Sequence, residues 1–108
     1  MHQPALQPLR IPGNWVVSYN TFHEVDPSPS ARQYLCEDLF QATCSRTNVL
    51  VDLGWYPDGD VTGNFVLQVY LGDFTGQLLS RAEAPTRTQA VDILEAALWK
   101  YHCIAPST

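Results

Sequence analysis

The middle of the chain carries a two-residue repeat of apolar side chains. In the run NVLVDLGWY, residues 48–56, the apolar positions of one side are Val49, Val51, Leu53 and Trp55. Because successive side chains of a strand point to opposite faces, this run predicts a strand with one core face. Residues 65–71 repeat the pattern after the segment PDGDVTGN, whose proline, glycines and acids predict the turn of a hairpin.

Two further strands are predicted, one before and one after this hairpin along the chain. Residues 14–22, NWVVSYNTF, are rich in aromatic and β-branched residues, and we expect Trp15, Val17 and Tyr19 on one side of that strand. The sequence GDFTG offers a second turn after the return strand, and residues 77–84 can supply a last, weaker strand. Strands that follow one another through short turns are expected to lie antiparallel.

Helical spacing occurs in two places. Residues 33–43 predict a short helix from apolar residues at intervals near one and four, which are Tyr34, Leu35, Leu39, Phe40 and Ala42. Residues 86–102 predict a longer helix, whose apolar stripe consists of Ala90, Val91, Leu94, Ala97, Leu98 and Tyr101. Its start is expected at Thr86, because that side chain can accept a hydrogen bond from the backbone of Gln89.

These elements predict an α+β fold, in the order strand, short helix, three-strand meander and C-terminal helix. The antiparallel sheet is expected to have about four strands, with the helices packed on one face and the other face left open. At 108 residues and 45% hydrophobic content, the chain can fill one core, so a single domain over 1–108 is expected. Prolines without periodicity predict an irregular N-terminal arm over 1–13, followed by an ordered core over 14–104.

The charge balance bears on the partner. Six basic residues against eleven acidic ones give a formal net charge of -5, and the basic residues are scattered singly. A nucleic-acid partner is not expected, because binding to phosphates requires clustered Lys and Arg. An acidic protein is instead attracted to basic surfaces, so a basic protein partner is favoured, with plain solubility as the alternative explanation of the charge.

The remaining composition predicts a cytoplasmic location. Residues 1–12 lack the apolar run of a secretory signal, and no segment has the roughly 20 apolar residues of a membrane span. Cys36, Cys44 and Cys103 are odd in number, which is more typical of thiols in a reducing compartment than of a disulfide framework. Neither metal-binding nor nucleotide-binding spacings occur, so no cofactor and no small-molecule substrate are expected.

The strand registers predict a candidate partner-binding surface. If Trp55 is buried, Tyr56 and Asp52 must turn outward, and Gln68 and Tyr70 of the return strand fall on the same outer face. Asp58 and Asp60 are expected at its rim. Aromatic rings beside carboxylates are the usual composition of a hot spot that binds a basic protein, whereas an ordinary solvated sheet surface is the alternative.

Several short motifs give the chain a resemblance to a known family. They are Asn14-Trp15, Tyr19-Asn20-x-Phe22, Val25-Asp26-Pro27, Glu37-Asp38-Leu39 and Val51-Asp52-Leu53-Gly54-Trp55-Tyr56-Pro57. With these motifs, over about residues 14–100, the chain resembles the immunity proteins of bacterial contact-dependent growth inhibition systems. The resemblance implies a non-enzymatic cytoplasmic protein that binds and neutralises the C-terminal toxin domain, commonly a nuclease, of a large secreted effector.

Two other functions stay open at this point. One is a small hydrolase that uses Asp52 or Glu37 together with His23, although a small sheet with a helix on one face offers little depth for a catalytic cleft. The other is a general adaptor or assembly subunit, which would associate with itself without any toxin.

Overall fold

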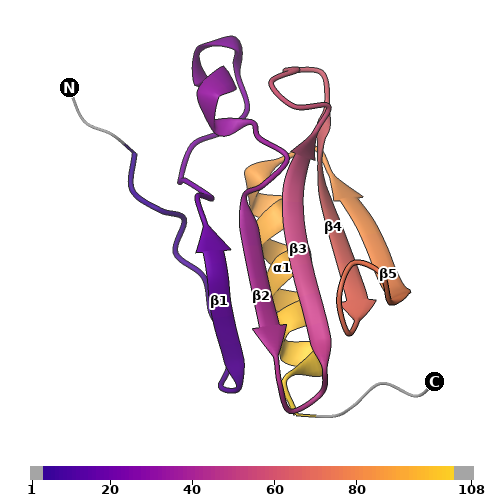
Figure 1. The fold of residues 1–108 in the computed structure, drawn as a ribbon. Helices are drawn as coiled ribbons and strands as arrows, with labels where there is room; N and C mark the ends of the chain where they lie inside the picture. Colours follow the sequence, from indigo (N-terminus) through magenta and orange to yellow (C-terminus); the bar gives the residue numbers. More distant parts are fainter. Residues whose placement is uncertain (1–3, 104–108) are drawn as a thin grey trace.

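Five strands pair in the order in which they occur along the chain, and one α-helix lies behind them (Figure 1). The computed structural model describes residues 4–103, so the first three residues of the predicted arm and Ile104 of the predicted core lie outside the described part. The elements are β1 (Trp15–Asn20), the 3-10 helix η1 (Pro29–Tyr34), β2 (Phe40–Cys44), β3 (Val49–Tyr56), β4 (Asn64–Leu71), β5 (Gln77–Ala84) and α1 (Arg87–Tyr101). All neighbouring strands are antiparallel.

The α+β fold class is confirmed. The predicted hairpin, the last strand and the C-terminal helix occur within one or two residues of their expected bounds. The backbone amide of Gln89 donates to the hydroxyl of Thr86 over 3.2 Å, so the predicted N-cap is also present. Within residues 4–103, no helix has the length and apolar character needed to cross a lipid bilayer.

The short helix predicted for residues 33–43 is wrong. The first two residues of this segment end η1, and its last residues form β2. Because of β2 the sheet has five strands, where about four were expected. In β2 the buried side chains are Phe40, Ala42 and Cys44, which is the two-residue alternation of a strand. Pairing with β3 over five residues outweighed the weak local helical spacing.

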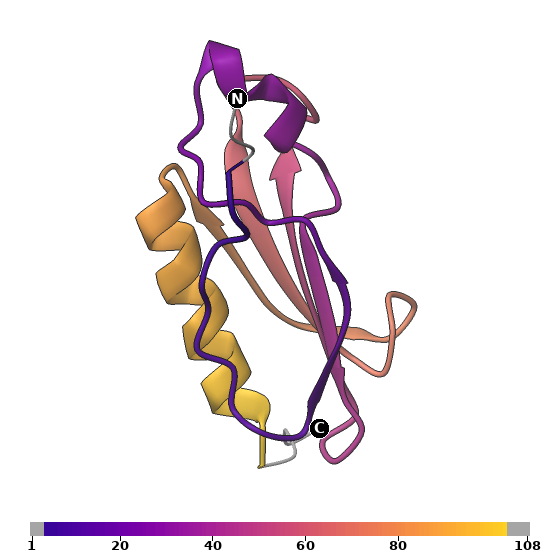
Figure 2. The ribbon, with the colours of Figure 1, turned by 90° about the vertical axis from the view of Figure 1, so that its left-hand side faces the viewer.

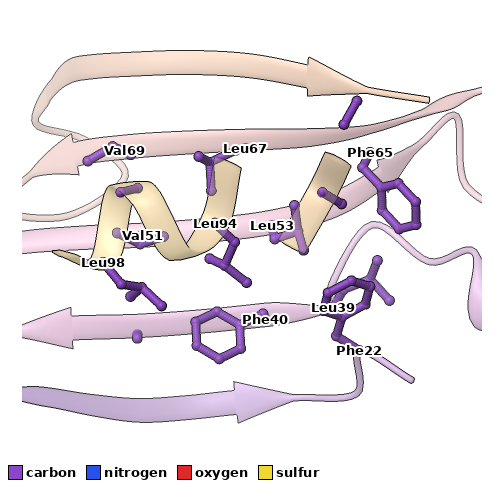
Figure 3. Packing of buried hydrophobic residues seen from close by; sticks show 14 of the residues in the cluster. Phe22, Leu39, Phe40, Val51, Leu53, Phe65, Leu67, Val69, Leu94 and Leu98 are labelled. Carbon is purple, nitrogen blue, oxygen red and sulfur yellow. The ribbon is translucent and has the colours of Figure 1, made fainter. Parts of the chain in front are cut away.

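The hydrophobic core lies between α1 and one face of the sheet (Figures 2 and 3). The alternate residues of β3 that were predicted to face the core are all buried there, and Leu94 and Leu98 of α1 pack on the same cluster. Trp55 belongs to it as well, because its ring packs edge-on against Phe65 at 4.8 Å between centroids. Its indole N–H donates to the carbonyl of Asp60 over 2.7 Å, so the buried polar atom is satisfied.

Residues 4–13 of the N-terminal arm form only an isolated bridge, between Leu6 and His23, and they lie against α1 (Figure 2). The backbone N–H of Arg10 donates to the carboxylate of Glu95 over 2.7 Å, and Leu9 is partly buried against the core. Just after the arm, the Trp15 indole N–H donates to the carbonyl of Leu98 over 2.9 Å. The arm therefore closes the side of the core that lies between α1 and β1.

The turns at the two ends of β4 have the same sequence pattern, Gly-Asp-x-Thr-Gly, at 59–63 and 72–76. In each, the aspartate accepts hydrogen bonds from the backbone and hydroxyl of the threonine two residues later. Both first glycines have positive φ, which a residue with a side chain rarely adopts. The residue at x differs in its environment, because Val61 packs against the core while Phe74 is 51% exposed.

The segment before β2 crosses close over β3 at Gly54. Two backbone hydrogen bonds hold it there, from Trp55 N–H to the carbonyl of Cys36 over 2.7 Å and from Leu39 N–H to the carbonyl of Leu53 over 3.0 Å. A Cβ on Gly54 would overlap the carbonyl oxygen of Glu37. Glycine at position 54 is therefore required by the close approach of two backbones.

We expect Gly54→Ala to lower the free energy of unfolding by about 2 kcal/mol or more, because two backbone hydrogen bonds must shift to admit the methyl group. Gly13→Ala is the matched control, since nothing lies within 4 Å of its Cβ position. It is expected to change stability by no more than about 0.5 kcal/mol. Urea unfolding of the three proteins measures both effects, and equal stability of the two variants would contradict the crossing at Gly54.

Candidate functional site

The face of the sheet opposite α1 carries all four strand residues of the predicted binding surface. The register places Asp52 opposite Gln68 and Leu50 opposite Tyr70 across the β3–β4 pair. The segment between η1 and β2 crosses one end of this side at Gly54, and the β4–β5 turn leans toward it at the other end (Figure 2). We call it the open face; its strand residues are Val16, Tyr19, Gln41, Thr43, Leu50, Asp52, Gly54, Tyr56, Asn64, Val66, Gln68, Tyr70, Leu78, Arg81 and Glu83.

Tyr19 lies on the open face, which corrects the expectation that it shares a side with Trp15 and Val17. The pairing of β1 with β2 shifts between Val17 and Tyr19, so one extra residue, Ser18, stands in β1. Its hydroxyl donates to the carbonyl of Gln41 over 3.2 Å. An inserted residue reverses the side to which later residues point, and Tyr19 is thereby paired with Gln41 on the open face.

Asp52 is the most deeply buried acid of the predicted surface, with 6% of its surface exposed. It lines a pocket of about 260 Å³ on the open face together with Ser18, Tyr19, Asp38 and Gln41. Burial, and to a smaller extent the charge of Asp38, raises the pKa of the Asp52 carboxyl from 3.8 to about 6. Both causes disfavour the charged form of Asp52 in the folded protein.

Glu37 and Asp38 join this surface although they were not predicted to belong to it. They lie in the segment that crosses β3 at Gly54, and both are exposed. Burial first, and then the charges of Asp52, Glu37 and Asp38, raise the pKa of the Tyr56 hydroxyl. The wrong prediction of a helix over 33–43 prevented us from placing these two acids on the surface. Only the pairing of β2 with β3 brings their segment to the open face.

The two predicted rim acids have internal partners. The carboxylate of Asp58 accepts a hydrogen bond from the backbone of Glu37 over 3.0 Å and so helps to fix the crossing segment. Hydrogen bonds from the hydroxyl and backbone of Thr62 lower the pKa of the Asp60 carboxyl. Both acids are exposed at the β3–β4 turn, where they add negative charge, but each also stabilises local structure.

An apolar row crosses the other half of the open face. Its members are Val16, Leu50, Tyr70, Phe74 and Leu78, and the polar Thr43 of β2 lies between Val16 and Leu50. Tyr70 packs edge-on against Phe74, with 5.4 Å between ring centroids, so the β4–β5 turn contributes an exposed aromatic ring that sequence reasoning missed. In the sequence, Phe74 and Val61 occupy the same position of the repeated Gly-Asp-x-Thr-Gly turn. Only the fold shows that Val61 packs against the core while Phe74 does not.

The hydrolase alternative requires His23 close to Asp52 or Glu37, but the contacts of His23 are with other residues. Its ring packs against Tyr34, and its Nδ1 forms a hydrogen bond with the carbonyl of Thr21 over 2.7 Å. The three cysteines are free, and burial followed by the charges of nearby acids raises the pKa of the Cys36 thiol. Within residues 4–103, no three His, Cys, Asp or Glu side chains gather closely enough to hold one metal ion.

Comparison of the chain with protein families, with curated proteins and with solved structures gives no match. The resemblance to immunity proteins of contact-dependent growth inhibition systems therefore stays a prediction, and the functional inference depends on the chain's own residues.

We expect the stability of the protein to depend on pH through Asp52. Because its pKa is raised in the folded state, its stabilising contribution is present below about pH 3.8 and is lost as pH rises through about 6. Asp52→Asn should therefore raise the free energy of unfolding at pH 7.5 by about 1–2 kcal/mol, a value reduced for solvent screening in the open pocket. Urea unfolding of both proteins should show this advantage disappearing by about pH 4.

Asp73→Asn is the control of opposite sign. Hydrogen bonds from Thr75 lower the pKa of the Asp73 carboxyl, so its contribution is present at neutral pH and is lost as pH falls. That variant is expected to be less stable than the parent at pH 7.5. The difference in stability between the parent protein and Asp52→Asn should change between pH 4 and 7.5. A constant difference would contradict the burial of the Asp52 charge.

Proposed function

We propose that this chain is a cytoplasmic immunity protein that neutralises a cognate toxin domain, commonly a nuclease, by forming an equimolar complex on its open face. The observation that carries the proposal is the acidic half of that face, where Glu37, Asp38 and Asp52 lie beside Tyr19 and Tyr56. Sequence resemblance and net charge of -5 support the same role. The toxin is the C-terminal part of a large secreted effector and is a basic protein.

The charge distribution suits a basic partner. Arg81 is the only Lys or Arg in the five strands, and its guanidinium already pairs with Glu83 over 2.7 Å. The acidic half is therefore not neutralised by the sheet itself. A nuclease needs positive groups to hold its phosphate substrate, and an acidic inhibitor can occupy those groups. Colicin nucleases and their immunity proteins, which follow this logic, are among the tightest protein pairs known.

The apolar row gives the same face its hydrophobic anchors. Phe74 and Leu78 are exposed next to the half-buried Tyr70. Protein interfaces combine such aromatic and aliphatic anchors with charged groups that fix partner choice, and the anchors supply most of the binding energy. An open face with an apolar half and an acidic half meets both requirements.

A hydrolase is the second candidate, because a carboxyl with a pKa of about 6 beside another acid is also the arrangement of a general acid. Three observations favour binding over catalysis. His23 has other partners, the pocket is smaller than the roughly 300–1,000 Å³ typical of small-molecule sites, and no member of the apolar row lines the pocket. If the protein hydrolysed a substrate and Asp52→Asn abolished that activity, the hydrolase would be favoured instead.

We expect the protein to co-purify in equimolar amounts with the toxin domain encoded beside it and to rescue cells that express that toxin. Glu37→Lys and Asp38→Lys should slow association about tenfold or more at low salt, because they reverse charges on the acidic half. The effect should shrink at physiological salt, where charges are screened beyond about 8 Å. Stopped-flow mixing at several salt concentrations measures it.

Asp92→Lys is the matched control, since Asp92 is also exposed but lies on α1, on the far side of the sheet. It makes the same change in net charge and should slow association much less. Equal slowing by all three variants would mean that total charge, and not the open face, attracts the partner. Failure to bind or rescue with any neighbouring gene product would contradict the function itself.

We expect Phe74→Ala to speed dissociation of the complex about tenfold or more, because an exposed anchor at the apolar row is lost. Stability of the free protein should change little, since half of the ring is already exposed. Trp99→Ala is the control, because Trp99 is 52% exposed but lies on α1. Surface plasmon resonance gives the dissociation rates, and equal effects of the two variants would contradict the use of the open face.

A further inference from the structure

The pocket around Asp52 is built from three separate parts of the chain. β1 supplies Ser18 and Tyr19 at its bulge, residues 38–41 at the start of β2 supply Asp38 and Gln41, and β3 supplies Asp52. Its volume of about 260 Å³ admits one long side chain and is small for a drug-sized ligand. All the lining residues except Asp38 belong to strands, so the backbone of the sheet holds most of the groups in place.

Asp52 stands in this pocket without a partner. Only 6% of its surface is exposed, yet within residues 4–103 its carboxylate forms neither a hydrogen bond nor an ion pair. A largely buried charge without a partner is costly in free energy, and an opposite charge that binds beside it offsets part of that cost. The folded protein thus holds in advance a negative group that lacks only its counter-charge.

The other groups around the pocket are also suited to a cation. Asp38 adds a second carboxylate, and none of the five lining residues is basic. Ser18 already donates its hydroxyl proton to the carbonyl of Gln41, so its oxygen is left to accept hydrogen bonds. Tyr19 is 43% exposed beside the carboxylates, where its ring can cover a flat cationic group.

We propose that this pocket receives the guanidinium group of one arginine side chain of the protein partner, held by the carboxylates of Asp52 and Asp38 and covered by the ring of Tyr19. The inference rests on the proposed function and names the chemistry of its central contact. Arginine fits better than lysine, because a planar guanidinium with five N–H donors can pair with two carboxylates and stack on an aromatic ring together. A metal ion fits less well, because two carboxylates are too few ligands.

The pocket is tested directly with small probes and the full-length chain. N-acetyl-arginine amide is titrated into the isotope-labelled protein at pH 7.5 and followed by NMR. We expect shifts of the backbone signals of Tyr19, Gln41 and Asp52 that saturate with a dissociation constant on the order of millimolar. N-acetyl-citrulline amide, which has the same shape without the charge, should give no saturable shift, and N-acetyl-lysine amide should bind several-fold more weakly.

Two variants identify the group responsible. Asp52→Asn should weaken binding of the arginine probe at least about tenfold, because it removes the buried charge and keeps the shape of the side chain. Asp92→Asn makes the same change in net charge on α1, outside the pocket, and should weaken it less than twofold. Equal binding of the citrulline probe, equal effects of the two variants, or tighter binding of magnesium chloride at matched ionic strength would each overturn the proposal.

The partner complex separates this inference from the proposed function. With the cognate toxin domain, Asp52→Asn should raise the dissociation constant about 30-fold or more, since one partner of a buried charge pair is removed. A complex that forms and is unaffected by Asp52→Asn would overturn the arginine pocket and leave the immunity function standing. Binding of the arginine probe through Asp52, without any protein that binds or poisons the cell, would support the pocket and reject the immunity function.

Discussion

A sheet of five strands with a single α-helix can pack only one of its two faces against that helix, and the rest of the structure depends on this constraint. α1 packs against the alternate side chains of the central strands, including Leu53 and Leu67. Because the strand repeat is two residues, burial of these side chains turns Asp52 and Gln68 to the opposite side. The same hydrophobic contacts that stabilise the core therefore also fix the composition of the open face.

Two local interruptions give that face its particular shape. The extra residue Ser18 in β1 turns Tyr19 outward, and the lack of a side chain at Gly54 lets the segment carrying Glu37 and Asp38 cross close over β3. Without the first, the aromatic wall of the pocket would face the core side. Without the second, two of the acids could not approach the sheet. Irregularities of this kind occur often beside functional sites because they aim individual side chains.

The charge of Asp52, which pairs with no group within residues 4–103, connects the stability of the protein with its proposed binding. Burial raises its pKa to about 6, which means that the ionised carboxylate reduces the stability of the free protein at neutral pH. A cationic partner would remove that cost, so part of the binding energy would come from relief of an unfavourable state of the free protein. Proteins commonly accept lower stability where a binding group must be held ready. The apolar row beside it would supply the hydrophobic contacts.

The sequence alone determined the elements in which a single periodicity is strong. The alternation in β3 and β4, the dense turn residues between them and the capped stripe of α1 each specify one local structure, so their bounds and buried faces could be predicted. The outward positions of Asp52, Tyr56, Gln68 and Tyr70 followed from the same alternation.

Tertiary contacts decided the rest, because there the local signals were weak or opposed. Residues 40–44 alternate over only five positions next to helical spacing, and pairing with β3 made them a strand. The side to which Tyr19 points depends on one inserted residue that is visible only from its partner strand. The pocket joins positions 18 to 52 of the chain, and only the ordering of β1, β2 and β3 side by side brings such distant residues together.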